Sequence, residues 1–399
     1  MKTHQPEEQL KEFLDVTIEK IVPNGFGLGH TEGLTVMVQL VAPGDKVRVR
    51  TGKRNGNLIF AQVEEILEPS PLRAQPGCKY FGQCGGCNFQ QLSYEEQLKT
   101  KVSIIQDCLH RIAKIQDPPE INITRSSEPW HYRSRAGWHA DTVQKKLGYF
   151  YRDSNEVCDI DECPKLVEPL QTELTRLRNE LHWNELWSNV IHIDAASAGE
   201  QISLFSQEFA SEPAELTFES NGFQFNYNAN VFFQGNPYVT SKLVEAAVKD
   251  FRGGLALDLY CGVGLFTLPL AKNFSRVIGV EENPESINFA KKNAEKNEFR
   301  NIEFTNDDVG KGIKEHWRRL SALDTLLLDP PRIGVEKSVI GSIIEISPAE
   351  IVYVSCDPAT LARDLKALFA KYELIDIEAF DMFPQTHHVE TVAKLRLKK

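Results

Sequence analysis

A cysteine near the C-terminal end of the chain has neighbours that suit catalysis. Residues Ile351–Ser355 form an apolar, β-branched run that predicts a buried strand. Cys356 follows this strand, and Pro358 allows a helix to begin there, with helical spacing over Ala359–Leu368. Oriented N–H groups at a helix start favour a thiolate, which is the nucleophilic form of cysteine. The pattern predicts a nucleophile; an inert buried cysteine is the alternative.

Carboxylates end further predicted strands in the same part of the chain. Asp258 ends GLALD, and Gly262 and Gly264 of the following CGVG allow the backbone to turn closely around a ligand. Glu281 ends the next strand, where an acidic residue binds ribose hydroxyls in this topology; a strand-end cap is the alternative. No third glycine follows at dinucleotide spacing, so one nucleoside, such as S-adenosylmethionine, is favoured over NAD. Asp329 ends a fourth strand, in LLLDPPRIG.

The elements that must position these side chains alternate between strand and helix from about residue 236 onward. Strands are predicted at GLALDLY, RVIGVE, IEFTND, LDTLLLD and IVYVS, each followed by a helix. The chain ends with two further strands, YELIDIEAFDMF and VETVAKLRLK. This rhythm predicts a doubly wound α/β sheet with an antiparallel strand near its end.

A second group of cysteines has the spacing of a metal-binding loop. Cys78, Cys84 and Cys87 are arranged as C-x5-C-x2-C among glycines. Cys163, which precedes a proline, is the better candidate for a fourth ligand, and Cys158 is the alternative. Four cysteines suit either a [4Fe–4S] cluster or zinc, and the spacing does not separate the two.

The first half of the chain is predicted to be rich in β-strands. Residues 13–66 predict a small five-stranded barrel, and Lys46, Arg48 and Arg50 would share one face as a phosphate-binding strip or as a solvated edge. Residues 120–220 predict a second β-rich region. Its basic residues alternate with aromatic ones, which suits either an RNA surface or a sheet with an aromatic core.

Bulk composition sets the class of protein. A chain of 399 residues is too long for a single hydrophobic core, so two or three domains are expected. Its contents of 41% hydrophobic and 25% charged residues are ordinary for a globular protein. No apolar run approaches the roughly 20 residues of a membrane span, and the N-terminus lacks a signal-peptide core, so a cytoplasmic protein is expected. Eight cysteines there indicate metal binding or catalysis. The net charge of −11 argues only weakly against RNA, since phosphate contacts need a local basic surface.

Five segments, taken together and in order, resemble the RNA 5-methyluridine methyltransferases: FFQGNP, LDLYCGVGLFTLPLA, LLLDPPRIG, YVSCDPATLARDL and FPQTHHVETVAKL. The N-terminal IEKIVPNGFGLGHTEGLTVMVQLVAPGDKV resembles the TRAM domain, an RNA-binding barrel. The resemblance implies a TRAM-like barrel over 1–68, a central β-rich domain with the cysteine loop over 69–235, and a Rossmann-like class I methyltransferase domain over 236–399. It also implies a [4Fe–4S] cluster, rather than zinc, on Cys78, Cys84, Cys87 and Cys163.

The resemblance assigns a role to each candidate residue. Cys356 would add to C6 of a uracil, and Glu390 would accept the proton that leaves C5. The residues implied to line the methyl-donor and uracil site are Gln234, Tyr260, Glu281 and Asp329, with Asp308 as an adenine contact. The implied substrate is a uridine of 23S ribosomal RNA, with a transfer RNA T-loop uridine as the alternative, and a monomer is expected.

One residue departs from the family pattern, which commonly reads SCNP where this chain has SCDP. Asp357 places a carboxylate beside the nucleophile and is expected to raise the pKa of the thiol. A non-catalytic iron–sulfur RNA-binding protein is the alternative from another class, but it leaves Cys356, Asp329 and Glu390 unexplained. A radical enzyme is disfavoured because the loop lacks C-x3-C-x2-C spacing.

Overall fold

The computed structural model describes residues 12–315 and 322–399, and the chain forms two compact units. The first unit contains the chain up to Gly82 together with 87–100 and 385–387, and the second contains 83–86, 101–384 and 388–399. The predicted N-terminal barrel lies in the first unit, and most of the two later predicted domains lies in the second. Each unit is described by itself below.

The first unit is built on a six-stranded sheet in the order β1-β5-β6-β4-β3-β2. Its elements are β1 (Phe13–Thr17), β2 (Lys20–Val22), the short 3-10 helix η1 (Pro23–Gly25), β3 (Phe26–Thr31), β4 (Leu34–Val38), β5 (Lys46–Asn55) and β6 (Leu58–Glu68). Alternate residues such as Val47 and Val49 are buried, as the period of two requires. The all-β prediction is confirmed, but the structure has one strand more than the five predicted.

Three basic side chains of β5, Lys46, Arg48 and Arg50, are paired with carboxylates of the neighbouring strands. Lys46 Nζ lies 2.9 Å from Glu68, Arg48 Nε 2.9 Å from Asp15, and Arg50 2.8 Å from Glu64. All these side chains are largely exposed to solvent. Since each of these three positive charges has a negative neighbour, the structure favours a solvated face over a phosphate-binding strip for Lys46, Arg48 and Arg50.

The central part of the second unit is a five-stranded antiparallel sheet in the order β10-β9-β8-β11-β12. The elements of this region are α2 (Glu168–Glu180), η3 (Trp183–Glu185), β8 (Arg135–Asp141), β9 (Lys146–Phe150), β10 (Val157–Asp159), β11 (Val190–Ala198), β12 (Gln201–Phe205) and the hairpin β13 (Leu216–Ser220) with β14 (Phe223–Tyr227). Tyr132 and Trp138 are fully buried, and partly buried Arg135 donates to the carbonyls of Asn228 and Ala229. For Tyr132 and Trp138 the core alternative is right, and the Arg135 guanidinium is held by backbone carbonyls of the fold.

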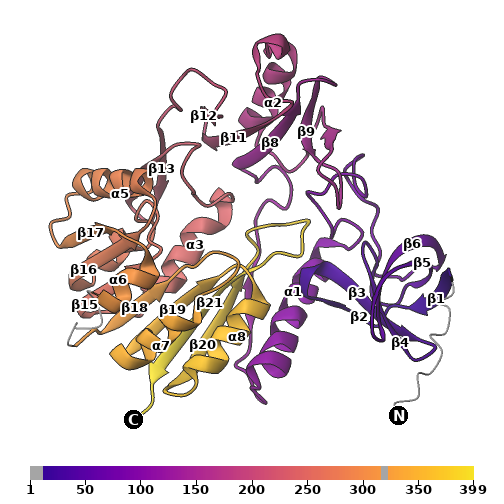
Figure 1. Cartoon of the computed structure of the whole chain (residues 1–399). Helices are drawn as coiled ribbons and strands as arrows, with labels where there is room; N and C mark the ends of the chain where they lie inside the picture. The colour runs from indigo at the N-terminus through magenta and orange to yellow at the C-terminus, as the bar shows by residue number, and fades with distance from the viewer. Residues whose placement is uncertain (1–11, 316–321) are drawn as a thin grey trace, which may run out of the picture. The chain divides into compact units, whose positions relative to one another are not determined.

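The C-terminal part of the second unit is an eight-stranded sheet in the order β17-β16-β15-β18-β19-β21-β20-β7 (Figure 1). Its strands are β7 (Asn122–Thr124), β15 (Gly253–Leu259), β16 (Phe274–Glu281), β17 (Ile302–Asn306), β18 (Thr325–Leu328), β19 (Glu350–Ser355), β20 (Tyr372–Phe380) and β21 (Glu390–Leu397). Strands β17 to β19 pair in parallel, and β21 is antiparallel to both its neighbours. The doubly wound prediction is confirmed; the edge strand β7, from much earlier in the chain, was not predicted.

Helices cover this sheet and fix the strand ends. They are α3 (Pro237–Val248), α4 (Thr267–Ala271), α5 (Pro284–Lys296), α6 (Val309–Glu315), α7 (Lys337–Ile346) and α8 (Pro358–Leu368). Helix α7 packs between α6 and α8, while α3 packs against α4, β20 and β21. Earlier in the chain, α1 (Tyr94–Cys108) continues into the π-helical turn η2 (Leu109–Ala113). Val239 and Leu243 of α3 share one buried cluster with Val352 and Val354 of β19.

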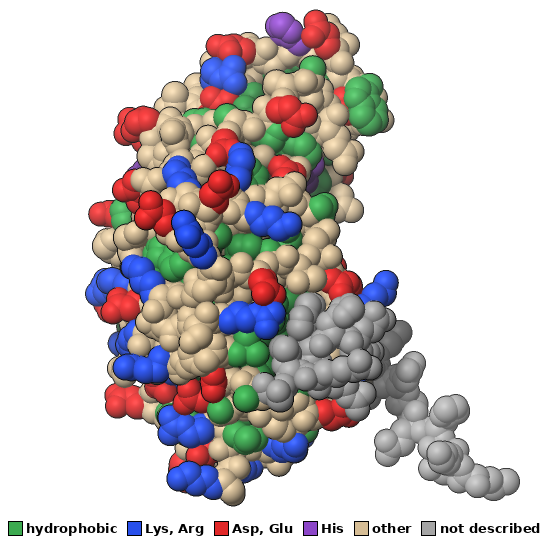
Figure 2. Space-filling model, turned by 90° about the vertical axis from the view of Figure 1, so that its left-hand side faces the viewer, with side chains coloured by type: hydrophobic (Ala, Val, Ile, Leu, Met, Phe, Trp, Pro, Cys, Tyr) green, Lys and Arg blue, Asp and Glu red, His purple; other side chains and the backbone are tan. Residues whose placement is uncertain are grey.

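Two surface properties bear on function. No helix within the described ranges is long and apolar enough to cross a membrane. On the face drawn in Figure 2, acidic and basic side chains are interspersed, and neither charge forms a continuous patch. This face therefore offers no extended basic track for a phosphate backbone.

Candidate active site

The register of two antiparallel strands brings Cys356 and Glu390 together. Strands β19 and β21 pair Val354 with Val392 and Ser355 with Thr391, and the Thr391 hydroxyl donates to the Ser355 carbonyl at 3.1 Å. The next positions along this register are Cys356, directly after the last residue of β19, and Glu390, the first residue of β21, so both lie at the same end of the sheet. Two residues 34 positions apart in the sequence, 356 and 390, thus become neighbours.

The start of α8 is occupied by Asp357 and not by the thiol. The Asp357 carboxylate accepts hydrogen bonds from the N–H groups of Ala359, at 2.9 Å, and Thr360, at 2.8 Å. Burial, with smaller contributions from the carboxyl groups of Glu390, Asp329 and Asp357, raises the pKa of the Cys356 thiol to about 12. The prediction that the helix start favours a thiolate is wrong, because a carboxylate already takes those N–H groups. The predicted effect of Asp357 on the thiol has the expected sign.

The carboxyl groups around the thiol also hold their protons more tightly than usual. Burial, with a smaller contribution from nearby Asp329, raises the pKa of Glu390 to about 8. Burial alone raises the pKa of Asp329 to about 7. Arg332 is the cation of this site, since its charge lowers the pKa of both Cys356 and Glu390. Among the residues that the structure describes, Glu390 forms no ion pair, so the salt-bridge alternative for this carboxylate gains no support.

Buried contacts anchor the loop that leads into β21 and thus position Glu390. The Lys101 ammonium group forms an ion pair with Asp381, and both side chains are completely buried. Lys101 also donates to the Phe383 carbonyl at 3.1 Å, and the Tyr132 hydroxyl donates to the Pro384 carbonyl at 2.9 Å. Sequence reasoning missed this support, because a lysine in an amphipathic helix carries no signal that it is buried.

A second set of groups, at the ends of β15 and β16, fits a nucleoside. The Glu281 carboxylate accepts from the N–H groups of Gly262, at 3.1 Å, and Asn283, at 2.8 Å. Gly262 has a φ of 54°, and a Cβ there would meet no atom within 4 Å, so the turn leaves open space beside the backbone. Asp258 is buried with one carboxylate oxygen lacking a partner among the described atoms, and its pKa is raised to about 8 by burial. A polar ligand at this turn would find an acceptor or a donor in Asp258.

The three remaining predicted donor-site residues occupy different surroundings. Tyr260 has a φ of 67°, and its pKa is raised by burial and by the carboxylates of Glu336 and Asp308. Asp308 is exposed and accepts from the Lys311 N–H at 2.8 Å near the start of α6. This hydrogen bond alone gives Asp308 a structural role, without a ligand. Gln234 lines a separate cavity beside the start of α3. The structure thus groups Cys356, Glu390 and Asp329, and groups Glu281 with the glycine turn. Among the described residues, no hydrogen bond or ion pair joins the Gln234 side chain to either group.

The four predicted cluster ligands are divided between the two units, so each pair is considered within its own unit. In the second unit, Cys84 Sγ accepts from the Gly86 N–H at 3.4 Å, and the Cys163 N–H donates to Gln171 at 2.8 Å. Burial raises the pKa of Tyr149, and Cys163 and Cys84 raise it further, so both thiols lie near one phenol. In the first unit, the Cys78 N–H donates to Gln90 at 3.1 Å. Among the described residues, no three metal-binding side chains are arranged as a metal site.

Comparisons with known proteins agree with this geometry. The family model for tRNA (Uracil-5-)-methyltransferase matches residues 162–398. A 23S rRNA (uracil(1939)-C(5))-methyltransferase from Shewanella amazonensis is 33% identical, over 98% of this chain and 97% of its own. An RNA methyltransferase of uncharacterized function from Halalkalibacterium halodurans is 30% identical over the whole of both chains.

The solved structures include one similar protein of nearly the same extent. It is the tRNA (uracil-54, C5)-methyltransferase of Pyrococcus abyssi in complex with S-adenosyl-L-homocysteine. Its TM-score is 0.74 at 26% identity, over 96% of this chain and 100% of that one. The family model, the full-length relatives and this shared architecture lead to one conclusion: the chain belongs to the tRNA (uracil-5-)-methyltransferase family.

Proposed function

We propose that this protein transfers a methyl group from S-adenosylmethionine to C5 of a uridine in RNA. The observation that carries the proposal is the β19–β21 register, which places a cysteine and a buried carboxyl group side by side at the end of the sheet. The glycine turn and Glu281 at the ends of β15 and β16 supply a nucleoside site in the same unit. The residues that would hold the donor are Gln234, Tyr260, Glu281, Asp308 and Asp329.

The proposed mechanism follows from the low nucleophilicity of uracil C5. C5 is too weak a nucleophile to take a methyl group unaided, so the Cys356 thiolate adds to C6 and pushes the ring electrons into an enolate with density at C5. The bound donor supplies an electrophilic sulfonium methyl group, which C5 attacks. Glu390 as carboxylate then accepts the C5 proton, the electron pair re-forms the C5–C6 double bond, and the Cys356 sulfur leaves as thiolate.

The raised pKa values of Cys356 and Glu390 indicate that both groups must lose a proton before they can act in the reaction. In the substrate-free protein the Cys356 thiol and the Glu390 carboxyl both favour their protonated forms near neutral pH. Catalysis needs both in their charged forms, so a basic group beside them matters, and Arg332 is that group. The target base must also leave its stack to reach the strand ends, which requires a few kcal/mol unless the RNA loop already splays it.

We propose a uridine of 23S ribosomal RNA as the target. The support is the name of the Shewanella relative, which matches nearly the full length of this chain at 33% identity. A transfer RNA uridine is the second candidate, supported by the name of the Pyrococcus neighbour. Mapping 5-methyluridine in the ribosomal and transfer RNA of cells with and without this protein decides between the two.

A covalent trap tests the reaction itself. RNA that carries 5-fluorouracil offers fluorine where Glu390 would remove a proton, so the adduct on Cys356 cannot be resolved. Incubation with S-adenosylmethionine and this RNA should give a protein–RNA complex that survives denaturing electrophoresis, with the peptide containing Cys356 modified. If no complex forms with any RNA that the protein binds, the proposed chemistry is refuted.

We also propose that Cys78, Cys84, Cys87 and Cys163 hold one [4Fe–4S] cluster. The support is the C-x5-C-x2-C spacing, the later Cys-Pro, and the approach of Cys84 and Cys163 to the same phenol of Tyr149. The cluster would be a structural or RNA-positioning element, because the uracil chemistry needs no electron transfer. Protein purified without exposure to air should be brown and contain about four irons per chain. Stoichiometric zinc without iron would contradict this.

A further inference from the structure

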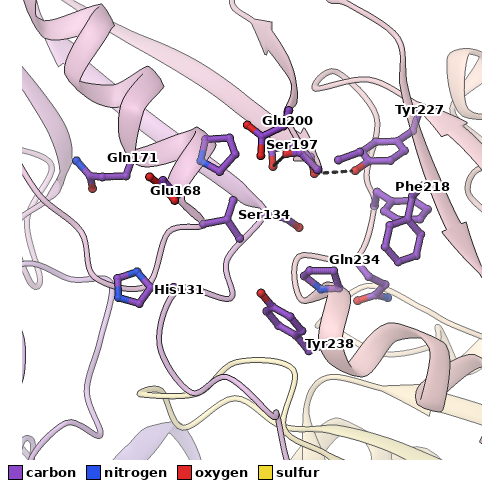
Figure 3. A pocket seen from close by; sticks show the side chains of 16 residues that line it. His131, Ser134, Glu168, Gln171, Ser197, Glu200, Phe218, Tyr227, Gln234 and Tyr238 are labelled. Carbon is purple, nitrogen blue, oxygen red and sulfur yellow. Dashed lines mark hydrogen bonds between the residues drawn. The ribbon is translucent and has the colours of Figure 1, made fainter.

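The central part of the second unit contains a cavity whose lining includes Gln234 but no other residue of the proposed chemistry. Its volume is about 740 Å³, within the range of small-molecule and cofactor sites. Its walls come from the first turn of α2, the end of β11, the β13–β14 hairpin and the start of α3. Figure 3 shows these side chains around an open centre, with Phe218 and Tyr227 on one side and His131 and Gln171 on the other.

Two polar side chains in this wall, Ser134 and Gln234, have no hydrogen-bond partner within the described residues. Ser134 is 6% exposed and Gln234 is 5% exposed. Within the described part of the chain, neither the Ser134 hydroxyl nor the Gln234 side-chain amide forms a hydrogen bond, and both line the cavity. Neither side chain is among the described polar atoms that are both sealed from solvent and unpaired, so these groups remain accessible from the cavity. The cavity therefore presents donors and acceptors that a ligand can satisfy.

The carboxylates in the cavity wall argue against an anionic ligand, and the aromatic residues suit a flat, neutral group. Glu168 and Glu200 both line the cavity, and no lysine or arginine is among its described lining residues. A phosphate would meet two carboxylates without a counter-charge. The aromatic part of the wall includes Phe218 and Tyr238, of which Tyr238 is 43% exposed. The exposed ring of Tyr238 beside unpaired polar groups suits the stacking and edge recognition of an unstacked nucleobase.

The cavity is also connected to the catalytic strand through the start of α3. The Ser134 N–H donates to the Gly235 carbonyl at 2.9 Å, which joins β8 to the segment that carries Gln234. The Asn236 side chain donates to the Met382 carbonyl at 3.3 Å, in the loop that follows β20 and leads to Glu390. RNA that delivers a uridine to Glu390 could therefore place a neighbouring nucleotide in the cavity.

We propose that this cavity binds a second unpaired nucleobase of the substrate RNA, one that carries an exocyclic amino group. An ionised carboxylate accepts hydrogen bonds but has none to donate. Glu168 and Glu200 therefore select a base edge rich in N–H donors. Adenine, cytosine and guanine have an amino group, and uracil has none. The proposal rests on the proposed RNA methylation for its biological setting, but the binding can be measured separately.

The test compares short single-stranded RNAs that differ in one central nucleotide, at constant salt and without methyl donor. The full-length protein, purified without exposure to air, is titrated into fluorescently labelled RNA, and the dissociation constant is read from anisotropy. Tyr238→Ala removes an exposed ring, and Ala198→Trp fills the cavity from the end of β11. Each should weaken the binding of RNAs with central adenosine, cytidine or guanosine about tenfold, the scale of one lost base–aromatic stack. Glu200→Gln should reduce the preference of these three over uridine.

Trp187→Ala is the matched control, because Trp187 is a 76% exposed aromatic residue of the same region that does not line this cavity. It should leave all four dissociation constants unchanged. Equal loss for all four nucleotides, or competition by inorganic phosphate, would show that the cavity holds the RNA backbone and would overturn the proposal. Unchanged binding in both Tyr238→Ala and Ala198→Trp would also overturn it. Wild-type protein that shows the base preference but methylates no RNA would refute the proposed function alone.

Discussion

Two strand–helix junctions of the C-terminal sheet have the same backbone arrangement but differ in the charge of the residue that caps the helix. At the β16–α5 junction, Asn283 precedes Pro284 and accepts from the N–H groups of Glu285, at 2.9 Å, and Ser286, at 3.1 Å. At the β19–α8 junction, Asp357 precedes Pro358 and accepts from two N–H groups at 2.9 and 2.8 Å. In both, an Asx residue caps the helix and proline occupies its first turn.

The difference lies in the charge of the cap and in what it does to the group at the strand end. The neutral Asn283 adds no charge beside Glu281, and two backbone N–H groups donate to the Glu281 carboxylate. The charged Asp357 adds to the carboxyl groups that oppose ionisation of Cys356. A helix start therefore stabilises a strand-end anion only where its N–H groups remain available, and here each cap has already taken them.

Cys356→Ser removes the reactive group of the β19–α8 junction and should have the largest effect. A serine hydroxyl is far less ionised than a thiol, so methyl transfer should fall below detection while the fold is retained. Turnover with labelled S-adenosylmethionine measures the first, and circular dichroism with a melting curve measures the second. Substantial activity in the variant would show that Cys356 is not the nucleophile.

Glu390→Gln should block the reaction at a later step. The amide cannot accept the C5 proton, but thiol addition and methyl transfer need no such acceptor, so the adduct of Cys356 with a 5-methylated uridine should accumulate. Denaturing electrophoresis with labelled RNA, followed by mass spectrometry of the linked peptide, detects it. A variant that turns over at the wild-type rate without adduct would exclude Glu390 as the base.

The sequence predicted the two junctions because their signals are local. A β-branched strand, an Asx-Pro pair and helical spacing place Cys356, and a glycine turn followed by a strand-end carboxylate places Glu281. The neighbourhood of Cys356 and Glu390 came from resemblance to a family, since a register between segments 34 residues apart has no local signal. The raised thiol pKa was predicted only in part: Asp357 is visible in the sequence, but the burial that dominates the shift is a property of the packed fold.

Glu281→Gln tests the other junction and should have a moderate effect. The amide oxygen can still accept from Gly262 and Asn283, so the turn should persist, but the negative charge that would bind ribose hydroxyls is lost. The dissociation constant for S-adenosylmethionine, measured by calorimetry, should rise about tenfold, on the scale of one charge-assisted hydrogen bond. The affinity for RNA in the absence of donor should not change. Loss of both affinities together would indicate a folding defect rather than a donor contact.

Asp357→Asn converts the β19–α8 cap into the β16–α5 type and should have the smallest effect. Asparagine caps a helix as well as aspartate does, so stability should be unchanged. Removal of one negative charge lowers the pKa of the Cys356 thiol, and a lower pKa gives more thiolate at any pH below it. We therefore expect kcat/KM to rise a few-fold at neutral pH. The gain is small because burial, which the substitution leaves in place, is the largest cause of the raised pKa.

The pH dependence and a second substitution separate charge from capping. Because the thiol pKa of about 12 lies far above the assay range, the ratio of variant to wild-type kcat/KM should stay constant between pH values of about 6.5 and 8.5. Asp357→Ala removes the same charge but also the cap, so it should show a similar ratio with stability lower by about 1 kcal/mol. If Asp357→Asn is slower than wild type while equally stable, the Asp357 carboxylate assists catalysis. The two junctions would then differ in more than the effect of the cap on the thiol pKa.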